Sequence, residues 1–203
     1  MNLPTFNEEN LLWKQGFDHI AGVDEVGRGC FAGPVVTAAV ILPQKFTSPI
    51  PVNDSKLLQP KIRTILSEFI KKQAVAFSIA EVSVAVINKL GIGQATQQAF
   101  RSAIKNLSKR PDYILIDAFY IKHLSKHNQK PIIHGDGISI SIAAASIIAK
   151  VYRDELMEKL HTKFEHYDFA TNKGYGTKKH REAIGKYGLS KLHRKSFNLE
   201  KFL

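Results

Sequence analysis

Carboxylate side chains follow three apolar runs of this chain, at the points where the runs end: Asp24 with Glu25, then Asp117, then Asp136. If the runs are strands of one sheet, their ends are where sites form in α/β proteins. Several buried carboxylates in one place need a cation, and Mg²⁺ and similar hard ions prefer oxygen ligands. The pattern therefore predicts a site for two divalent ions that hydrolyses phosphodiester bonds.

Two features of these acids leave another interpretation open. Each acid could be an ordinary turn or capping residue at the end of a strand. Neighbouring residues of a strand also face opposite sides of the sheet, so Asp24 and Glu25 cannot both reach one ion from a regular strand. Gly27 could supply a bend or bulge that brings Glu25 round.

The glycine-rich segment 27–34 (GRGCFAGP) separates two of the predicted strands. It is not a nucleotide-binding P-loop, because no Gly-Lys-Ser/Thr follows, and the next residues are typical of a strand rather than a helix. Its glycines would let backbone amides approach a ligand closely. A simple tight turn explains them equally well.

Charge and composition narrow the class of protein. The 203 residues carry 29 Lys and Arg against 18 Asp and Glu, a net charge of +11. Such a balance favours a polyanionic partner, most often nucleic acid and less often a membrane surface, although a basic but otherwise ordinary enzyme would share it. With 44% hydrophobic and 23% charged residues, the chain is a globular protein of about one domain.

The location of the protein is predicted from what the sequence lacks. A single cysteine, Cys30, excludes an internal disulfide and a multi-cysteine zinc site, and it fits a reducing compartment. Residues 1–10 hold two glutamates and no apolar stretch, unlike a signal peptide. The longest apolar runs, 35–42 and 142–149, are far shorter than a membrane span. We therefore expect a soluble cytoplasmic protein that does not enter membranes.

The hydrophobic pattern predicts a mixed sheet flanked by helices, an α/β layer architecture. Expected strands cover residues 20–25, 35–42, 75–82, 113–117 and 131–134, and the first three could pair as an antiparallel meander. Expected helices cover 60–72, 84–107 with a break near 91–93, and 140–160. The first helix would bury Ile62, Ile65, Leu66, Phe69 and Ile70, and the last has a small-residue face for close packing on the sheet.

The character of the chain changes near residue 161, where aromatic and basic residues mix and the apolar period weakens. We expect residues 1–160 to form the catalytic core. Residues 161–203 would form a small helical appendage packed on that core, because about 40 residues rarely hold a core of their own. The whole chain would then be one structural domain.

Several long motifs make the sequence recognisable. AGVDEVGRGCFAGPVVTAAVIL, NDSKLL, ILIDAF, HGDGISISIAAASIIAKVYRD, NKGYGTKKH and LHRKSF follow one another in this order over residues 20–197. In this order they resemble ribonuclease HII, the type 2 ribonuclease H family. The resemblance implies an RNase H-like fold and an Mg²⁺- or Mn²⁺-dependent endonuclease. Its substrates would be RNA/DNA hybrids and duplex DNA with single embedded ribonucleotides, cut 5′ of the ribonucleotide to leave 3′-hydroxyl and 5′-phosphate ends.

The resemblance also assigns roles to residues. Asp24, Glu25, Asp117 and Asp136 match the family's catalytic, metal-binding acids. Gly27, Arg28 and Gly29 match a motif that reads the ribose 2′-hydroxyl, which distinguishes RNA from DNA at one position. Tyr175 matches the tyrosine that packs on the adjacent sugar, although an exposed loop aromatic is the plain alternative. We expect the nucleic-acid backbone to be bound by these basic residues: Lys56, Lys178, Lys179, Arg181 and Arg194.

The sequence departs from the usual family pattern at Val26, Cys30, Phe31 and His134, and none of these changes removes a ligand. His134 could tune contacts with metal or phosphate, but a lone histidine is more often structural. Arg28 separates the chain from the type 3 enzymes, which typically carry threonine there.

Two other functions remain to be weighed. A structure-specific DNA nuclease would share the fold and metals, but it would have no 2′-hydroxyl for the glycine-arginine-glycine motif to read. A non-catalytic nucleic-acid-binding module would be weakened by four acids facing a polyanion. We expect a monomer. The apolar residues 197–203 could dock a replication or transcription partner, or could simply pack on the chain itself.

Overall fold

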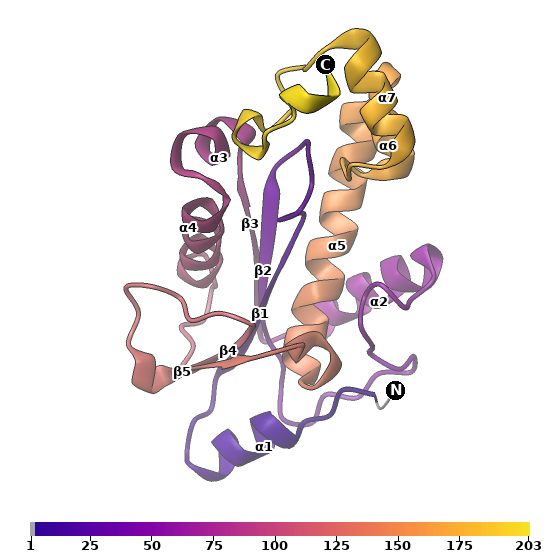
Figure 1. Ribbon diagram of the computed structural model, residues 1–203. Coiled ribbons are helices and arrows are strands. Elements are labelled where there is room, and N and C mark those ends of the chain that lie inside the picture. Colours follow the sequence, from indigo (N-terminus) through magenta and orange to yellow (C-terminus); the bar gives the residue numbers. More distant parts are fainter. Residues whose placement is uncertain (1–2) are drawn as a thin grey trace.

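The chain is built around one mixed β-sheet with helices on both faces (Figure 1). The computed structural model describes residues 3–203. The prediction that residues 1–10 are not a signal peptide therefore concerns a segment whose first two residues lie outside the described part. The strands are β1 (Ile20–Val26), β2 (Val35–Ile41), β3 (Ala76–Val82), β4 (Tyr113–Asp117) and β5 (Gln129–Ile132). The helices are α1 (Asn7–Lys14), α2 (Pro60–Gln73), α3 (Val84–Leu90), α4 (Ile92–Lys105), α5 (Ile140–His161), α6 (Phe169–Asn172) and α7 (Lys178–Tyr187).

The sheet confirms the predicted α/β class. Its strand order is β3-β2-β1-β4-β5, in which β1, β2 and β3 form the expected antiparallel meander. Strands β4 and β5 run parallel to β1. Every residue of β2 is buried, because this Val- and Ala-rich strand lies second in the sheet and is covered on both faces.

Most elements lie where the sequence predicts them. Strand β4 has the predicted bounds, and the long helical region breaks at Gly91 into α3 and α4. Strand β5 is an exception, since it ends at Ile132, two residues before the predicted end. Helix α1 was not predicted, because its short sequence carries only a weak apolar pattern.

Helices α5 and α2 cover one face of the sheet, and α3 and α4 cover the other (Figure 1). The small-residue face of α5 lies on the sheet as predicted, with Ala143, Ala144 and Ala145 fully buried. The approach is so close that a side chain at Gly22 would overlap the backbone of Ser141. Glycine is therefore required at this position of β1.

Helix α2 shows one error in the predicted pattern. Ile65 was expected on the buried face, but 48% of it is exposed. Arg63 is buried in its place, and its guanidinium pairs with Asp154 of α5 at 3.1 Å. The ion pair and backbone hydrogen bonds compensate the burial of the arginine, which a hydrophobic pattern does not reveal.

The C-terminal segment packs on the end of α5, at the top of Figure 1. Its apolar cluster includes Tyr167, Phe169 and Ile184, and it incorporates Met157 of α5. The tail folds back on the same cluster, because the ring of Phe202 lies 5.6 Å from that of Phe31. Leu199 is buried as well.

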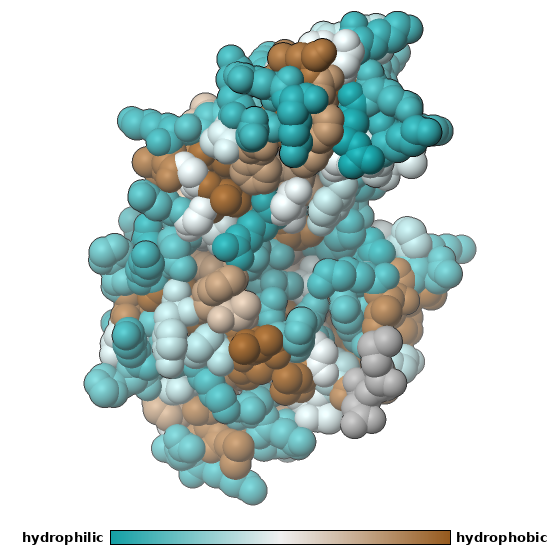
Figure 2. Space-filling view, viewed as in Figure 1, coloured by the Kyte–Doolittle hydropathy of each residue, from teal (hydrophilic) through white to brown (hydrophobic). Residues whose placement is uncertain are grey.

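The surface is mostly hydrophilic on the face shown in Figure 2, with apolar residues in small patches. A notch separates the C-terminal segment at the top from the molecule below it. Within residues 3–203, no helix combines the length and the apolar character needed to cross a membrane.

Candidate active site

The register of two parallel strands brings the first acids together. Val23 of β1 pairs with Ile116 of β4, so the next residues, Asp24 and Asp117, lie at equivalent positions where the strands end. Both side chains line one cavity of about 540 Å³, and Glu25 lines it too. Three of the four predicted acids therefore share one cavity.

Of the bend or bulge expected near Gly27, the strand shows no bulge, and Glu25 reaches the cavity without one. The pairing of β1 with β2 is regular through Val26, which lies opposite Val36. The chain turns only after the strand, at Gly27, whose φ is +86°. Because β1 ends directly after Glu25 and Val26, the cavity at its tip is open to residues from both faces of the strand.

The fourth acid, Asp136, lies in a neighbouring hollow. It belongs to a short 3₁₀ turn, η2 (Gly135–Gly137), and is buried. The amide of Gly135 donates to Asp117 Oδ1 at 2.8 Å, which ties this turn to the end of β4. Lys56 lines both hollows, with its Nζ 3.2 Å from Asp136 Oδ2. The lysine thus connects Asp136 with the other three acids.

Burial and mutual repulsion make these acids hard to ionise. Burial raises the pKa of Asp24 well above its ordinary value, and the neighbouring Glu25 carboxylate raises it further. Burial also raises the pKa of Glu25 to about 7, although the Arg28 guanidinium opposes this shift. The pKa of Asp117 is raised by burial as well. A cation among the carboxylates would relieve this cost.

The donor set fits a hard divalent ion. Asp24, Glu25, Asp117 and Asp136 supply only carboxylate oxygens, and Glu25 Oε2 is buried with no hydrogen-bond partner. Among residues 3–203, however, no three acidic, histidine or cysteine side chains converge closely enough to form a finished ion site. The acids would have to draw together around an ion, and Lys56 now pairs with one of them.

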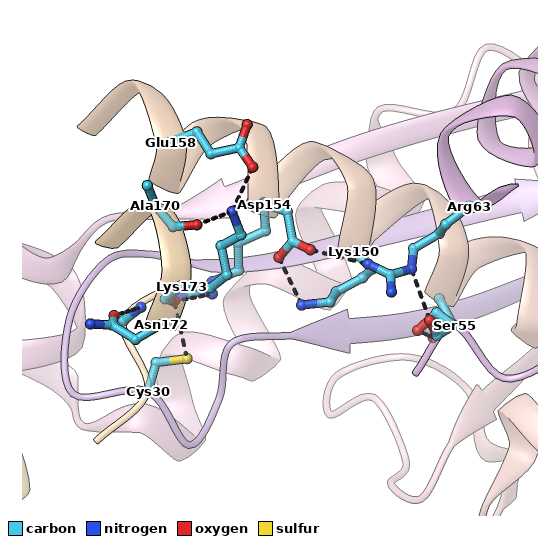
Figure 3. A network of polar contacts seen from close by, with 12 residues as sticks. Cys30, Ser55, Arg63, Lys150, Asp154, Glu158, Ala170, Asn172 and Lys173 are labelled. Carbon is cyan, nitrogen blue, oxygen red and sulfur yellow. Dashed lines mark hydrogen bonds and ion pairs between the residues drawn. The ribbon is translucent and has the colours of Figure 1, made fainter. Parts of the chain in front are cut away.

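The cavity also contains two basic residues that no sequence motif singles out. Arg63 and Lys150 line it, and both are held by Asp154 through bonds of 3.1 and 2.7 Å (Figure 3). Arg63 Nε also donates to the carbonyl of Ser55, whose hydroxyl lies 3.0 Å from that of Ser146. Only the spacing of Lys150 and Asp154, one helical turn apart, could have indicated such a network.

The glycine-arginine-glycine loop packs against a buried arginine of α5, Arg153. A side chain at Gly27 would collide with the guanidinium of Arg153, so only glycine fits there. Arg153 is fully buried, and its Nε donates to the carbonyl of Pro34 at 3.0 Å. Arg28 itself is half-buried, with its guanidinium 4.6 Å from the centre of the Phe119 ring.

Arg194 corrects the expectation that it binds the nucleic-acid backbone. Its side chain is fully buried, and burial lowers its pKa to about 10. It donates to the carbonyls of Gly33 and Arg28 at 2.8 Å each. Each of its three guanidinium nitrogens thus donates to a carbonyl of the loop, and the buried side chain offers none of them to a phosphate at the surface. It is a positioning residue for that loop.

Tyr175 lines the cavity of the acids, with 42% of its surface exposed. Its carbonyl is held by a directional chain of two buried histidines. The Ser190 amide donates to His193 Nδ1 at 2.9 Å, so the ring proton of His193 must be on Nε2. That proton is donated to His180 Nε2 at 3.0 Å, and His180 Nδ1 in turn donates to the Tyr175 carbonyl at 2.8 Å. Burial lowers the pKa of both histidines, which favours these neutral forms.

The remaining predicted residues lie outside the acid cavity. Lys178, Lys179 and Arg181 are exposed at the start of α7. His134 is exposed, has φ +56° and lines the hollow of Asp136. Cys30 is buried, with its Sγ 3.7 Å from the carbonyl of Lys173 (Figure 3).

Comparison with known proteins identifies the family. A family model described as Ribonuclease HII matches residues 21–200. The chain belongs to the ribonuclease HII family. A ribonuclease HII of Desulfitobacterium hafniense is 50% identical over 190 residues, which cover 94% of this chain and 72% of that protein. The chain is therefore a ribonuclease H enzyme, an endonuclease that acts on RNA in RNA/DNA hybrids.

Solved structures confirm the RNase H fold. The ribonuclease H2 of Pyrococcus horikoshii has a TM-score of 0.75 at 25% identity and covers 91% of this chain and 98% of its own. The ribonuclease HII of Archaeoglobus fulgidus, solved in complex with PCNA, has a TM-score of 0.69 at 26% identity. The match covers 89% of this chain and 96% of that protein. Bst-RNase HIII in complex with Mn²⁺ has a TM-score of 0.72 at 20% identity, and the match covers 91% of this chain and 68% of that protein.

Proposed function

We propose that this ribonuclease HII also cuts duplex DNA on the 5′ side of a single embedded ribonucleotide and leaves 3′-hydroxyl and 5′-phosphate ends. One observation carries the proposal: Tyr175 lines the same cavity as Asp24, Glu25 and Asp117. An aromatic face beside the acids can pack on one sugar while the adjacent phosphate lies among them. The loop of Gly27, Arg28 and Gly29, which follows β1, would read the 2′-hydroxyl of the ribonucleotide.

Asp24, Glu25, Asp117 and Asp136 would hold two Mg²⁺ or Mn²⁺ ions. Such ions activate water and neutralise charge at a scissile phosphate. The burial of Asp24 and the unpartnered oxygen of Glu25 support this assignment. Lys56 would exchange its ion pair with Asp136 for a contact with substrate phosphate.

Other basic residues would hold the substrate. Lys150, fixed by Asp154, would bind a phosphate at the cavity wall. Arg63 would hold Asp154 in place, because its three nitrogens already donate to Ser55, Leu58 and Asp154. Lys178, Lys179 and Arg181 would contact the duplex farther away, since they are exposed on α7. These contacts position the duplex without reading its sequence.

Two further proposals concern the C-terminal segment. We infer that residues 161–203 are an appendage of one structural domain, because their apolar cluster includes Met157 of α5. A replication partner at the tail would have to compete with the packing of Leu199 and Phe202 on the chain itself.

The experiment compares three labelled duplexes: DNA with one ribonucleotide, all-DNA, and a long RNA/DNA hybrid. Each is incubated with Mg²⁺, Mn²⁺ or a chelator, and the ends of the products are mapped. We expect metal-dependent cutting immediately 5′ of the ribonucleotide and no cutting of the all-DNA duplex. Cutting of all-DNA would instead indicate a structure-specific DNA nuclease, and products that form in chelator would contradict the role of the metals.

A further inference from the structure

A second, larger hollow lies beside the acid cavity, between α4 and the loop that follows β4. Its volume is about 660 Å³, within the range of sites that bind ligands. The residues that matter in its lining are these: Arg28, Arg101, Phe119, Tyr120, Lys122 and His123. We call it the α4 groove.

The loop side of the groove is held in one conformation by two glutamines. Gln97 of α4 donates to the Tyr120 carbonyl at 2.9 Å and accepts from the Lys122 amide at 2.7 Å. Gln129 does the same for the residue between them: it accepts from the Ile121 amide at 2.8 Å and donates to its carbonyl at 3.1 Å. Ile121 is buried as an anchor. The groove is therefore formed before any ligand arrives, which lowers the entropic cost of binding.

This anchored loop leaves two aromatic rings in solvent. Phe119 is 44% exposed and Tyr120 is 45% exposed, and both line the groove. Exposed aromatic faces of this kind stack on bases or pack on sugars. Because the rings are already fixed by the loop, they gain contact area on binding without losing much freedom.

The charge of the groove has one sign. Arg28, Arg101 and Lys122 line it, and none of the described residues that line it is acidic. Within residues 3–203, neither Arg101 nor Lys122 makes an ion pair with a carboxylate. The groove is thus complementary to a polyanion, and its cations are available to neutralise phosphates.

The groove continues directly from the acid cavity. Asp117 ends β4, Ala118 takes the left-handed conformation with φ +63°, and Phe119 follows as the first aromatic of the groove. Its ring lies under the guanidinium of Arg28, whose loop leaves the end of β1. The groove therefore lies on the path that a nucleic-acid strand would take if it left the acids past Arg28.

We propose that the α4 groove binds the sugar-phosphate backbone of the DNA that flanks the ribonucleotide, with phosphates on Arg101 and Lys122 and sugars on Phe119 and Tyr120. The inference rests on the proposed function, because it extends the substrate site of the same enzyme. It assigns affinity to the groove and leaves recognition of the ribonucleotide to the acid cavity.

The test measures how much affinity the protein gains when the flanks are lengthened. The parent protein of the test carries Asp24→Asn. Its Kd is measured by fluorescence anisotropy for duplexes that contain one ribonucleotide and have either short or long DNA flanks. The same measurement is made after adding Arg101→Gln with Lys122→Gln, and after adding Tyr120→Ala. Lys105→Gln is the control, because Lys105 is an exposed lysine one turn beyond Arg101 on the same helix and does not line the groove.

We expect the long flanks to bind more tightly to the parent protein and to Lys105→Gln. The double variant should lose about five- to tenfold in affinity for the long duplex, and the salt dependence of log Kd should become shallower by about 1 to 2. Tyr120→Ala should lose affinity with an unchanged salt slope, since it removes contact area but no charge.

Equal gains from long flanks in the parent and the double variant would overturn the groove assignment. A loss of the same size in Lys105→Gln would overturn it too, because the effect would then reflect net charge alone. The proposed function fails by a different result: a parent protein that binds the ribonucleotide duplex no better than all-DNA of the same length.

Discussion

The side chain of Glu25 shows why the acid cavity is an unstable arrangement without a cation. One of its oxygens is buried and unpartnered, and burial holds its pKa near 7 in place of the ordinary 4.5. Between these two pH values, the folded protein keeps a proton that the unfolded chain has released. The free energy of unfolding of the metal-free protein must therefore fall as pH rises through this window.

The variant Glu25→Gln removes the contribution of Glu25 to this dependence and leaves those of Asp24 and Asp117. In chelator above pH about 7, it should be more stable than the wild type by about 2–3 kcal/mol, and below pH about 4.5 the two should be similar. Its neighbour Asp24 reinforces the effect, because the Glu25 carboxylate raises the pKa of Asp24. Urea unfolding at several pH values measures the difference.

Divalent ions supply the control for this prediction. Mg²⁺ or Mn²⁺ should stabilise the wild type at neutral pH, since an ion that binds only the folded state stabilises it by mass action. Glu25→Gln should gain less. If ions raised the free energy of unfolding of both proteins by the same amount at every pH, Glu25 would not have the role described.

Single residues also show where sequence reasoning stops. The four acids could be selected because each follows an apolar run, and such runs form buried strands in the structure. Arg194 was expected at the surface, as arginines usually are, but backbone carbonyls of a distant loop satisfy it in the interior. Arg63 is buried for the same kind of reason. Such partners are far apart in sequence, so no local pattern predicts them.

Among the elements, α5 depends on an acid from a helix that the sequence did not predict. Glu9 of α1 is fully buried, and its Oε1 accepts from Ser139 Oγ at 2.6 Å and from the Ser141 amide at 2.9 Å. A carboxylate at the start of a helix satisfies free amides and complements the helix dipole. Since Ser146 of α5 also faces the acid cavity, the position of this helix matters for the site.

Removing this carboxylate should cost stability. We expect Glu9→Ala to lower the free energy of unfolding by about 2 kcal/mol, because two hydrogen bonds to a charged group are lost from a buried position. Its neighbour Glu8 is the matched control. It makes an ion pair with Lys130 at 2.6 Å, but the two side chains are 21% and 47% exposed, so Glu8→Ala should cost less than about 1 kcal/mol. Denaturant curves that show equal losses would contradict the capping role.

The elements were predictable to the extent that their apolar periods were strong. Strand β4 and the helix break at Gly91 are read directly from the sequence. The end of β5 was misplaced because Ile133 extends the apolar run, yet it lies outside the strand and is 72% exposed. The equivalent positions of Asp24 and Asp117 follow from the register of β1 and β4, which only the structure supplies.

At the scale of the whole molecule, charge and fold support one function. The chain as a whole has a net charge of +11, which attracts a polyanion. The cavity itself is lined by acids, which attract cations. The buried arginines Arg153 and Arg194 fasten the glycine-rich loop to α5 and to the C-terminal segment. The loop of Gly27, Arg28 and Gly29 is thereby held next to the acids and Tyr175.

The most direct test of this account is single-turnover cleavage of duplex DNA with one ribonucleotide by Asp24→Asn, with binding measured on the same protein. We expect a rate at least about a thousandfold below the wild type, because ion binding among the acids is worth several kcal/mol, together with nearly unchanged affinity. Asp18→Asn, an exposed aspartate remote from the site, should cut at the wild-type rate. Cutting by Asp24→Asn at a rate close to the wild type, or a loss of binding as large as the loss of cutting, would contradict it.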